Sequence, residues 1–569
     1  MALRAVRVIT EVAAVDRPFD YALTERTAHV ALGDRVRVNF HNRSVRAWVV
    51  GEADPGRELK ALTKWLGYGP PPRLLELLEW ASERWCAPLS RLLAGASPKR
   101  LVTTLPIAPV AEGLAEAVRR EACELEPGLV QMAPTTDPMG LLVHAYETCR
   151  SREGSLVVLV PSEAWARRLR GRLEQRGCAV ASGEGEWDRM RAGWPVIVGA
   201  RGAALAPAPR LAGAVVFDAD DALYRSEAAP TWDAVSMLRE RCVRDGAPLW
   251  LASMLPSPVL VNDRPFQRDT DLVGGWPRVV VVDRRRSDPH EGALARVALD
   301  SAHRALDEGS AVAVAVVLQR LGTGRLLACV RCGELTRCAV CGLAEHEVDD
   351  VLSCREGHER RAKFCRSCGA TNLKRVRSGV STLARDVAAQ LAQPVSEVTS
   401  VTAPDAPLER VVVGTEAILQ RVRRCGVVIF ADFDQYLLAP RDTARREAVQ
   451  AVGRAGRLVG GRRDGRGSVV LQTRRGDDLV VRSLREASFD ELIDDDIATA
   501  RLLELAPYGA WAEVTGEGAS VLISELDRSE LRVSASDRGF VVHASDPMVL
   551  AHALRAAPRP AASVRIAVQ

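Results

Sequence analysis

Seven of the chain's 13 cysteines lie in closely spaced pairs between Cys329 and Cys368. The pattern reads Cys329-x2-Cys332, Cys338-x2-Cys341, Cys354-x3-His358 and Cys365-x2-Cys368. Thiolates and imidazoles at these spacings are typical zinc ligands, and eight ligands complete two tetrahedral sites. Three of the pairs are followed directly by Gly333, Gly342 and Gly369. A zinc knuckle turns tightly after its second thiolate, and glycine supplies the positive φ needed there. The block therefore predicts a small domain built around two Zn²⁺ ions.

The alternative is a set of disulfide bonds or free thiols, which a reducing cytoplasm disfavours. Spacing alone does not decide which pairs share an ion. His358 is the least secure ligand, because His346 competes with it and a surface histidine needs no metal. The remaining cysteines are scattered, and we expect them to pack rather than to carry chemistry: Cys86, Cys123, Cys149, Cys178, Cys242 and Cys425.

Short apolar runs alternate with helical segments on both sides of the cysteine block. The first set is Leu156–Val160, Val196–Val198, Ala214–Phe217 and Leu249–Leu251. The second set is Val279–Val282, Ala311–Leu318, Val411–Val413, Val427–Phe430 and Val469–Leu471. Continuous apolar runs separated by helices such as Ala164–Arg176 are typical of parallel sheets covered on both faces. The chain is therefore expected to contain two α/β lobes, with the cysteine block interrupting the second.

The two ends of the chain differ from these lobes. Residues 1–105 combine β-like runs, such as Val36–Phe40, with apolar residues at helical spacing from Arg73 to Leu93. Residues 106–138 contain few large apolar side chains and are expected to form a linker with a short helix. Residues 490–569 are expected to form a small α+β domain ending in the run Val564–Val568.

Charge is balanced overall but concentrated locally. The net charge is only +4, yet eight arginines face three carboxylates between Arg441 and Arg466. Eight basic residues face two carboxylates between Arg355 and Arg377. Such clusters either neutralise nucleic-acid phosphates or form a solvated surface. The sequence contains no run of about 20 apolar residues and its start lacks the features of a signal peptide, so we expect a cytoplasmic chain without a membrane partner.

Several motifs together point to a known family. They are Asp16-Arg-Pro-Phe-Asp-Tyr21, Val196-Ile-Val-Gly-Ala-Arg-Gly-Ala-Ala-Leu-Ala-Pro207, Val216-Phe-Asp-Ala-Asp-Asp-Ala-Leu-Tyr224, Ser253-Met-Leu-Pro-Ser257, Val413-Gly-Thr-Glu-Ala-Ile418 and Gln450-Ala-Val-Gly-Arg-Ala-Gly-Arg457. On these motifs the chain resembles primosomal protein N′ (PriA), the superfamily 2 replication-restart helicase, nearly from end to end. The family's versions include "VVGTRSALFAP", "VDEEHDSSY", "SATPS" and "VGTQMI". The zinc block falls between motifs, as it does in that family.

The resemblance implies an architecture. It is an α/β fold of two RecA-like helicase lobes with a zinc-ribbon insertion, a β-rich N-terminal DNA-binding domain and a small α+β C-terminal domain. The implied domains are a 3′-DNA-end-binding domain (1–105), a linker with a vestigial winged helix (106–138), lobe 1 without a Walker A loop (139–262), lobe 2 (263–489), a zinc insertion within lobe 2 (322–376) and a C-terminal domain (490–569). It also favours nested zinc ligands, with Cys329, Cys332, Cys365 and Cys368 on one ion and Cys338, Cys341, Cys354 and His358 on the other.

The motor motifs depart from the family. A phosphate-binding loop needs a Gly-Lys-Ser/Thr step, and none of the chain's five lysines follows a glycine. The family's Asp-Glu pair aligns with Phe217 and Asp218, or with Asp218 and Ala219 after a shift of one residue. Either alignment loses a carboxylate needed for the metal or the attacking water. Arg454 and Arg457 resemble the family's phosphate-sensing arginines, and are reassigned here to lobe packing or DNA phosphates. The chain thus resembles the degenerate PriA of actinobacteria, expected to lack ATPase and helicase activity.

The resemblance also implies partners. A 3′-end pocket would consist of Phe19, Asp20, Tyr21, Gly33 and Lys60, in which an aromatic ring stacks on the terminal base and a carboxylate accepts from the 3′-hydroxyl. Read without the family, Phe19 and Tyr21 are core residues of a small β-domain. The expected partners are forked DNA with a 3′-hydroxyl leading-strand end, primosome and replicative-helicase-loading proteins, and single-stranded-DNA-binding protein. The alternatives are an active ATP-dependent helicase with a divergent nucleotide site and a zinc-ribbon scaffold that does not bind DNA.

Overall fold

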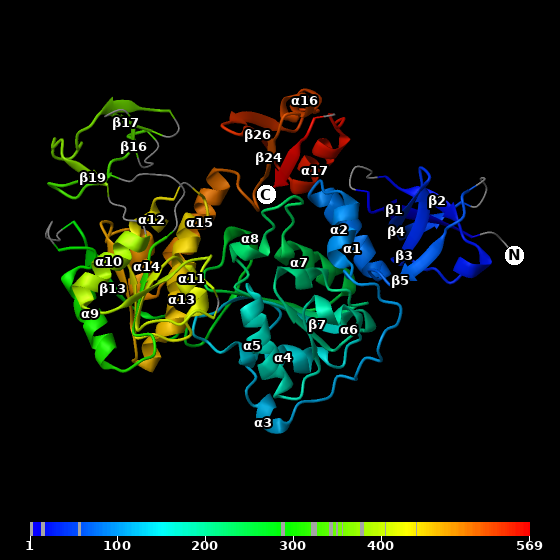
Figure 1. The fold of residues 1–569 in the computed structure, drawn as a ribbon, viewed down its shortest axis with the longest axis horizontal. Helices are drawn as coiled ribbons and strands as arrows, with labels where there is room; N and C mark the ends of the chain where they lie inside the picture. The colour runs from blue at the N-terminus through cyan, green and yellow to red at the C-terminus, as the bar shows by residue number, and fades with distance from the viewer. Residues whose placement is uncertain are drawn as a thin grey trace. The chain divides into compact units, whose positions relative to one another are not determined.

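The computed structural model describes residues 4–12, 17–54, 59–285, 291–319, 327–340, 345–348, 351–354, 357–375, 380–403, 405–439, 441–560 and 562–569. It divides into two compact units (Figure 1). Unit 1 comprises Met1–Val130, Asp137–Gln267 and Asp496–Gln569, and unit 2 comprises Gln131–Thr136 and Arg268–Asp495. Among the described residues, none of the helices combines the length and the apolar character that crossing a bilayer requires.

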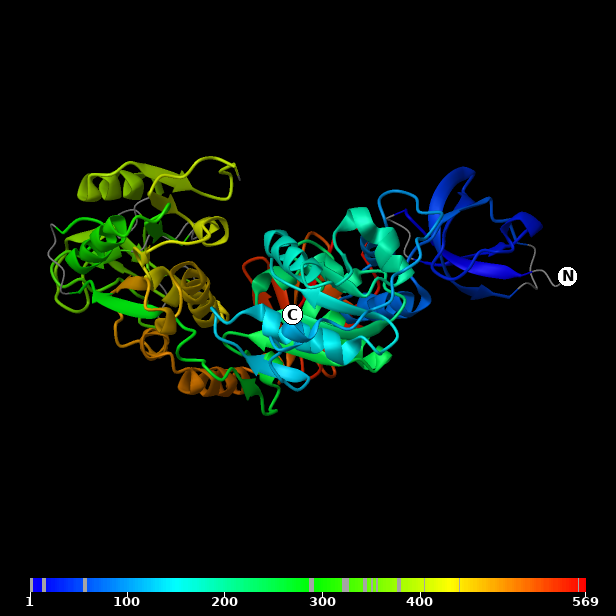
Figure 2. The same ribbon diagram turned by 90° about the horizontal axis from the view of Figure 1, so that it is seen from below.

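The N-terminal part of unit 1 is an antiparallel sheet in the order β2-β1-β4-β3-β5. Its strands are β1 (Ala5–Thr10), β2 (Phe19–Ala22), β3 (Arg35–Phe40), β4 (Arg43–Ala53) and β5 (Lys64–Gly67). Val8, Val36, Val38 and Val49 are fully buried in its core. Alternation along each strand sends these side chains to one face, because successive residues point to opposite sides of a sheet. The strands are drawn in blue in Figure 2.

A seven-stranded sheet in the order β12-β6-β11-β10-β7-β9-β8 forms the centre of unit 1. Its strands are β6 (Gly128–Gln131), β7 (Ser155–Leu159), β8 (Val180–Ala181), β9 (Val196–Gly199), β10 (Leu211–Phe217), β11 (Leu249–Ser253) and β12 (Gln267–Arg268). The pairs from β11 to β8 are parallel. On one face Val157 shares a core with Leu238 of α7 (Ala234–Asp245). On the other, the ring of Trp250 lies 6.0 Å from that of His144 in α4 (Pro138–Cys149).

The other helices of unit 1 are α1 (Pro72–Arg84), α2 (Leu89–Ala96), α3 (Glu116–Arg119), α5 (Glu163–Glu174), α6 (Trp187–Ala192) and α8 (Pro258–Val261). The C-terminal part is an antiparallel sheet, β25 (Arg532–Ser536), β26 (Gly539–Ala544), β24 (Ala510–Thr515) and β27 (Arg565–Val568), with α16 (Ala519–Ser524) and α17 (Pro547–Ala556). It packs on α1, where Arg555 donates to the carbonyl oxygen of Ser82 at 2.9 Å. Helix α15 (Asp490–Leu502) precedes it.

Unit 2 contains a six-stranded parallel sheet in the order β13-β23-β22-β14-β21-β20. Its strands are β13 (Arg278–Asp283), β14 (Val314–Val317), β20 (Val395–Val398), β21 (Val411–Gly414), β22 (Val427–Phe430) and β23 (Ser468–Thr473). Its helices are α9 (Arg296–Asp307), α10 (Val380–Leu391), α11 (Ala417–Arg421), α12 (Asp434–Leu437), α13 (Ala444–Val459) and α14 (Leu479–Glu486). Helices α9 and α10 share a core with the valines of β14 and β21. The two parallel sheets are the expected RecA-like lobes.

The cysteine-rich insertion lies between β14 and α10. It contains a two-stranded sheet of β15 (Leu327–Cys329) and β19 (Leu373–Arg375). A three-stranded sheet of β16 (His346–Val348), β17 (Val351–Ser353) and β18 (Arg360–Ala362) lies between them in sequence. The strands described in the insertion are only three residues long each. Such short elements are expected where metal ligands, rather than a large core, hold the fold together.

Two local expectations differ from the structure. The helical pattern from Arg73 to Leu93 is broken into α1 and α2, because Cys86 has a φ of +49° and Pro88 cannot donate a backbone hydrogen bond. The segment 106–138 is not a linker throughout: β6 joins the seven-stranded sheet, and its Val130 and Gln131 are buried. Only four residues long, β6 lacks the long apolar run that marks the other central strands.

Candidate metal centre and degenerate motor motifs

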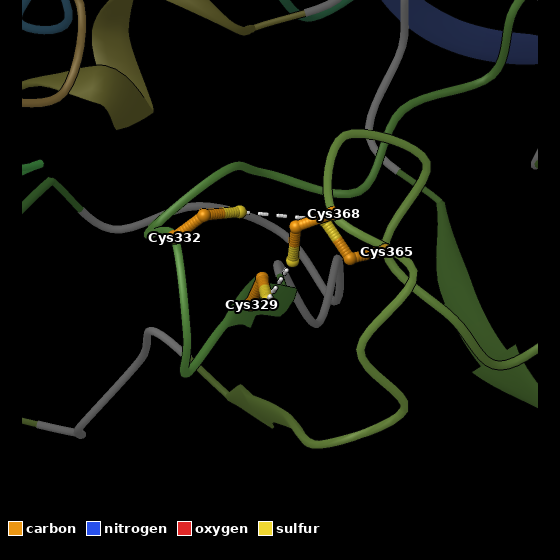
Figure 3. A group of neighbouring side chains, drawn as sticks. All are labelled: Cys329, Cys332, Cys365 and Cys368. Atoms are coloured by element: carbon orange, nitrogen blue, oxygen red, sulfur yellow. Dashed lines mark hydrogen bonds between the residues drawn. The ribbon is translucent and has the colours of Figure 1, made fainter.

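Four thiols converge in the cysteine-rich insertion (Figure 3). The Sγ atoms of Cys329 and Cys368 lie 3.5 Å apart, as do those of Cys332 and Cys365. All four Sγ atoms lie within 4.8 Å of one another. Tetrahedral zinc with Zn–S bonds of about 2.3 Å places neighbouring sulfurs about 3.8 Å apart, so the spacing fits one ion. The structure thus brings together the outer pairs that the nested arrangement assigns to one site.

The two turns that carry these thiols have the same backbone geometry. The Gly333 N–H donates to the Cys329 carbonyl at 2.9 Å, and the Gly369 N–H donates to the Cys365 carbonyl at 2.8 Å. Their φ angles are +74° and +73°, in the left-handed region that glycine adopts without strain. A backbone N–H from Ala370 holds the pKa of the Cys368 thiol at about 7, below its usual value. The expected knuckle turns therefore form at both outer pairs.

A second group consists of Cys338, Cys354 and His358. The Cys354 Sγ atom lies 3.9 Å from Nδ1 of His358. Cys341, the fourth expected ligand, lies outside the described residues, as does the side chain of the competing His346. Three ligands within 4.8 Å of one another leave one position of a tetrahedral site for a further ligand.

Among the described residues of the insertion, three basic side chains form ion pairs within it. The guanidinium of Arg361 forms two hydrogen bonds to the buried carboxylate of Glu345, at 2.8 and 2.5 Å. Lys363 pairs with Glu347 and Arg366 with Glu359. Glu345 and Glu347 lie outside the stretch in which the basic residues were counted, whereas Glu359 lies within it. The local positive field is therefore weaker than the sequence count indicates.

The altered acidic motif follows β10 in unit 1. Phe217 is buried and its ring lies 5.9 Å from that of Trp165 in α5. Asp218 is also buried and has a φ of +48°. The Ala219 N–H donates to the carbonyl oxygen of Ala252 at 2.9 Å. Phe217 is thus a packing residue at the strand end, and in the ungapped alignment it occupies the position of the family's first carboxylate.

A contact that the sequence did not reveal links two motifs of this lobe. The hydroxyl of Ser253, the last residue of β11, donates to the carboxylate of Asp220. Asp221, the next residue, accepts from the Leu223 N–H at 2.9 Å and caps a short 3₁₀ helix. Both carboxylates therefore have structural partners. The sequence signal was present in the adjacent acidic residues, but only the pairing of β10 with β11 shows which one meets Ser253.

The two motor arginines lie on α13 in unit 2. Arg454 pairs with Glu416 at 3.1 Å, and the hydroxyl of Tyr436 donates to the same carboxylate at 3.0 Å. Burial raises the pKa of Tyr436 well above its usual value, so this hydroxyl stays a donor. Arg457 donates from Nε to the carbonyl oxygen of Pro134 at 3.0 Å. Pro134 belongs to the turn of residues 132–136, between β6 and α4, and this turn is part of unit 2.

The start of α4 is occupied by a carboxylate. Asp137 caps the helix, accepting from the Met139 N–H at 3.0 Å, and it pairs with Arg172 at 2.6 Å. Burial opposes ionisation, but the hydrogen bonds from Arg172 and Met139 hold the pKa of Asp137 below its usual value. Residues Asp137 to His144 precede the run Leu156–Val160, where the resemblance to the family would place a phosphate loop, and they form the cap and first turns of a helix. The turn between β6 and α4, which comes before this helix, has the sequence Met132-Ala-Pro-Thr-Thr136.

The five expected DNA-end residues do not all share one face. Phe19 and Tyr21 point to the same side of β2: Phe19 packs against Phe40 with ring centroids 4.8 Å apart, and the Tyr21 hydroxyl donates to the carbonyl oxygen of Asn39 at 2.9 Å. Asp20 points to the other side and pairs with Arg7 at 3.2 Å. Alternation along the strand causes this separation.

The other two residues of the expected DNA-end pocket, Lys60 and Gly33, lie outside β2. Lys60 is exposed, and its carbonyl oxygen accepts from the Ala22 N–H at the end of β2, at 3.0 Å. Gly33 has a φ of +84°, and a Cβ there would lie 1.8 Å from the carbonyl oxygen of Pro70. Close backbone approach, rather than conformational freedom alone, therefore requires glycine at this position.

The fold defines a helicase-like protein with a β-rich N-terminal domain and a cysteine-rich insertion whose side chains could hold metal ions. Residues 7–98 match the family model of the PriA 3′ DNA-binding domain. The chain is 24% identical over 399 residues to the replication restart protein PriA of Thermotoga maritima, covering 63% of this chain. It spans 53% of that relative's length, about half. These matches confirm the resemblance to PriA-type replication restart proteins.

Solved structures give more distant similarities. Dbp5 of S. cerevisiae bound to RNA and ADP BeF3 is 10% identical, with 76% of this chain and 98% of that chain covered, at a TM-score of 0.35. A variant of the same protein bound to the same ligands is 11% identical, with 77% and 97% covered, at a TM-score of 0.36.

Proposed function

We propose that the chain recognises abandoned replication forks through its N-terminal domain and promotes primosome assembly and helicase reloading without hydrolysing ATP. The match of residues 7–98 to a 3′ DNA-binding domain and the similarity to a replication restart protein support the DNA-binding part. The observation that carries the non-hydrolysing part is the turn before α4, which holds no glycine and no lysine.

A phosphate loop works by electrostatics. Glycine-rich backbone amides and a lysine surround the phosphates, and the helix N-terminus that follows adds partial positive charge. Here the Asp137 carboxylate already caps that helix N-terminus. A nucleotide phosphate would meet a fixed negative charge where it needs donors. The carbonyl of Pro134, bound by Arg457, presents no donor either.

The acidic motif supports the same conclusion independently. Phe217 cannot hold a metal ion, and the Asp220 and Asp221 carboxylates are bound by Ser253 and by a backbone amide. Each part of the hydrolytic machinery contributes orders of magnitude to the rate, so the loss of two parts removes turnover.

In the proposed DNA-end site, Asp20 is the group best placed to meet a 3′-hydroxyl. Its side chain is exposed and its partner is a surface arginine, so a DNA hydroxyl can replace or join that contact. Phe19 is half-buried against Phe40, and the Arg17 guanidinium lies over its ring at 5.1 Å from the centroid, while Tyr21 supports the strand from the core. Zn²⁺ at the two cysteine centres would hold the insertion folded and so preserve its surface for partner proteins, among them primosome proteins and single-stranded-DNA-binding protein.

The test is anisotropy binding of the full chain to model forks whose leading-strand end carries a 3′-hydroxyl or a 3′-phosphate. We expect tighter binding to the hydroxyl form and loss of that preference in Asp20→Ala, with Asp54→Ala as the matched control. DNA-stimulated ATP turnover is measured in parallel and is expected to stay at background. Equal binding to both forks would support the scaffold alternative, and turnover that rises with DNA would support the helicase alternative.

A further inference from the structure

A cavity of about 430 Å³ lies at the edge of the unit 2 sheet where its parallel strands begin. Arg278 is the first residue of β13, Ser468 is the first residue of β23, and Gly426 precedes β22. Nucleotides in parallel α/β sheets bind at the opposite edge, beyond the carboxyl ends of the strands. The cavity is therefore separate from the place of a nucleotide in a helicase lobe.

The charged lining of the cavity is almost wholly basic. It consists of Arg278, Arg304, Arg462, Arg466, Arg485 and Glu308. Four of the arginines are exposed, and Arg462 is partly buried. Arginine presents planar, forked donors that match the oxygens of a phosphate group.

The exposed arginines are weakly engaged. Within the described part of the chain, no hydrogen bond or ion pair involves the Arg278 side chain. Arg466 approaches Asp464 only at 4.0 Å, and Arg485 pairs with Glu486 at 3.0 Å on the surface. Arg304 makes bonds to the carbonyl of Asp300 and the hydroxyl of Ser301, both at 3.2 Å. Exposed contacts of this kind contribute little to the stability of the fold, so a phosphate group can replace them.

Arg462, Gly426 and Gly467 form the backbone-packed sides of the cavity. Arg462 donates to the carbonyl oxygens of Pro277, Leu484 and Arg485, which fixes the end of α14 beside β13. A Cβ at Gly467 would lie 2.4 Å from the Gly426 carbonyl oxygen, so these two segments touch along their backbones. The concave shape is therefore part of the packed lobe, while three of the four exposed guanidinium groups make only surface contacts that a ligand can replace.

The geometry points to a phosphate-binding site in this cavity, which we call the arginine cavity. Its occupant carries at least two phosphate groups, because four exposed arginines face one carboxylate, Glu308, within the lining. The apolar lining is limited to Val279 and Ala305, without an aromatic ring for a base to stack on, so recognition is of phosphate and not of sequence. The phosphates belong to successive nucleotides of a DNA strand or to a free polyphosphate.

Binding of each possible ligand, a DNA strand or a free polyphosphate, can be tested on the full chain. Inorganic tripolyphosphate is titrated by calorimetry, and a single-stranded oligothymidine of about 20 nucleotides is titrated by anisotropy over a range of salt. The variant is Arg278→Gln/Arg466→Gln. The control is Arg296→Gln/Arg385→Gln, which makes the same charge change on exposed helical positions of unit 2. Unchanged melting curves verify that both variants fold.

We expect the arginine-cavity variant, and not the control, to lose about tenfold or more in affinity for at least one ligand. Loss for both ligands, with a salt slope lower by about 1 to 2, identifies DNA phosphates as the occupant. Loss for tripolyphosphate alone identifies a free polyphosphate. Equal behaviour of the two variants, or competition by polyglutamate as strong as by tripolyphosphate, would overturn the proposal. The tripolyphosphate titration uses no DNA, so its failure is distinct from a failure of fork binding.

Discussion

Arg457 donates a hydrogen bond from Nε to the carbonyl oxygen of Pro134 at 3.0 Å. The arginine that resembles a phosphate sensor thus holds the turn that stands where a phosphate loop would be. We propose that Arg457 stabilises this turn within unit 2.

Replacement of Arg457 by alanine should loosen the turn and leave catalysis unaffected. The loss of a charged donor to a backbone carbonyl costs about 1–2 kcal/mol locally. We expect faster amide hydrogen exchange in residues 131–136, with Arg385→Ala as a control on the same unit. ATP turnover in the unmodified chain that disappears in Arg457→Ala would contradict this role.

The cap of α4 should depend on pH. The pKa of Asp137 is lower in the folded chain than its usual value of about 3.9, so its stabilisation is complete above that pH and is lost as the pH falls through the folded pKa. Asp137→Ala should cost about 1 kcal/mol at neutral pH and nearly nothing at the acid limit. Urea unfolding at several pH values measures this, and a cost that does not change with pH would refute it.

Substitution of a ligand in one of the two candidate metal-ligand groups should remove the ion from that group alone. Cys329→Ser removes one of four ligands from the first group, and Cys338→Ser removes one from the second. We expect elemental analysis to find two zinc ions in the unmodified chain and about one in each variant. Cys425→Ser, a buried thiol outside both groups, should keep both ions. Retention of two ions in Cys329→Ser would reject the four-thiol site.

The ion pair of Arg361 with Glu345 should support the insertion. Glu345 is fully buried, so Glu345→Ala leaves a buried guanidinium without its partner and should cost about 3–5 kcal/mol. The double change Glu345→Ala/Arg361→Met should recover part of that loss. Limited proteolysis of the insertion is the readout, and a double variant as sensitive as the single one would contradict the coupling.

Substitutions at Tyr21 and at Asp20 should differ in their effect on the stability of the N-terminal domain. Tyr21→Phe removes the hydrogen bond to the Asn39 carbonyl and should lower the stability of the N-terminal domain by about 1 kcal/mol. Asp20→Ala removes only a surface pair with Arg7 and should cost less than about 1 kcal/mol. Thermal unfolding compares the two, and a large loss in Asp20→Ala would show that its effect on DNA binding is indirect.

Most strands of the two parallel sheets could be predicted from the sequence because they are continuous apolar runs. Val411–Val413 and Val427–Phe430 each lie within a strand whose residues are all buried. β6 (Gly-Leu-Val-Gln) and β20 (Val-Ser-Glu-Val) escaped prediction because polar residues interrupt their apolar runs, and neither strand is wholly buried. The break between α1 and α2 was also missed, since helical spacing of apolar residues continues across it.

The sequence by itself identified the candidate metal-ligand cysteines, the glycines that follow them and the absence of a Gly-Lys-Ser/Thr step, because each depends on residue type at fixed local spacing. Only the tertiary structure decided which outer thiols meet and that Arg457 binds Pro134. It alone gathered Arg278, Arg304, Arg466 and Arg485 around one cavity. These relationships join residues far apart in the chain, and strand order and packing, rather than local pattern, place them together.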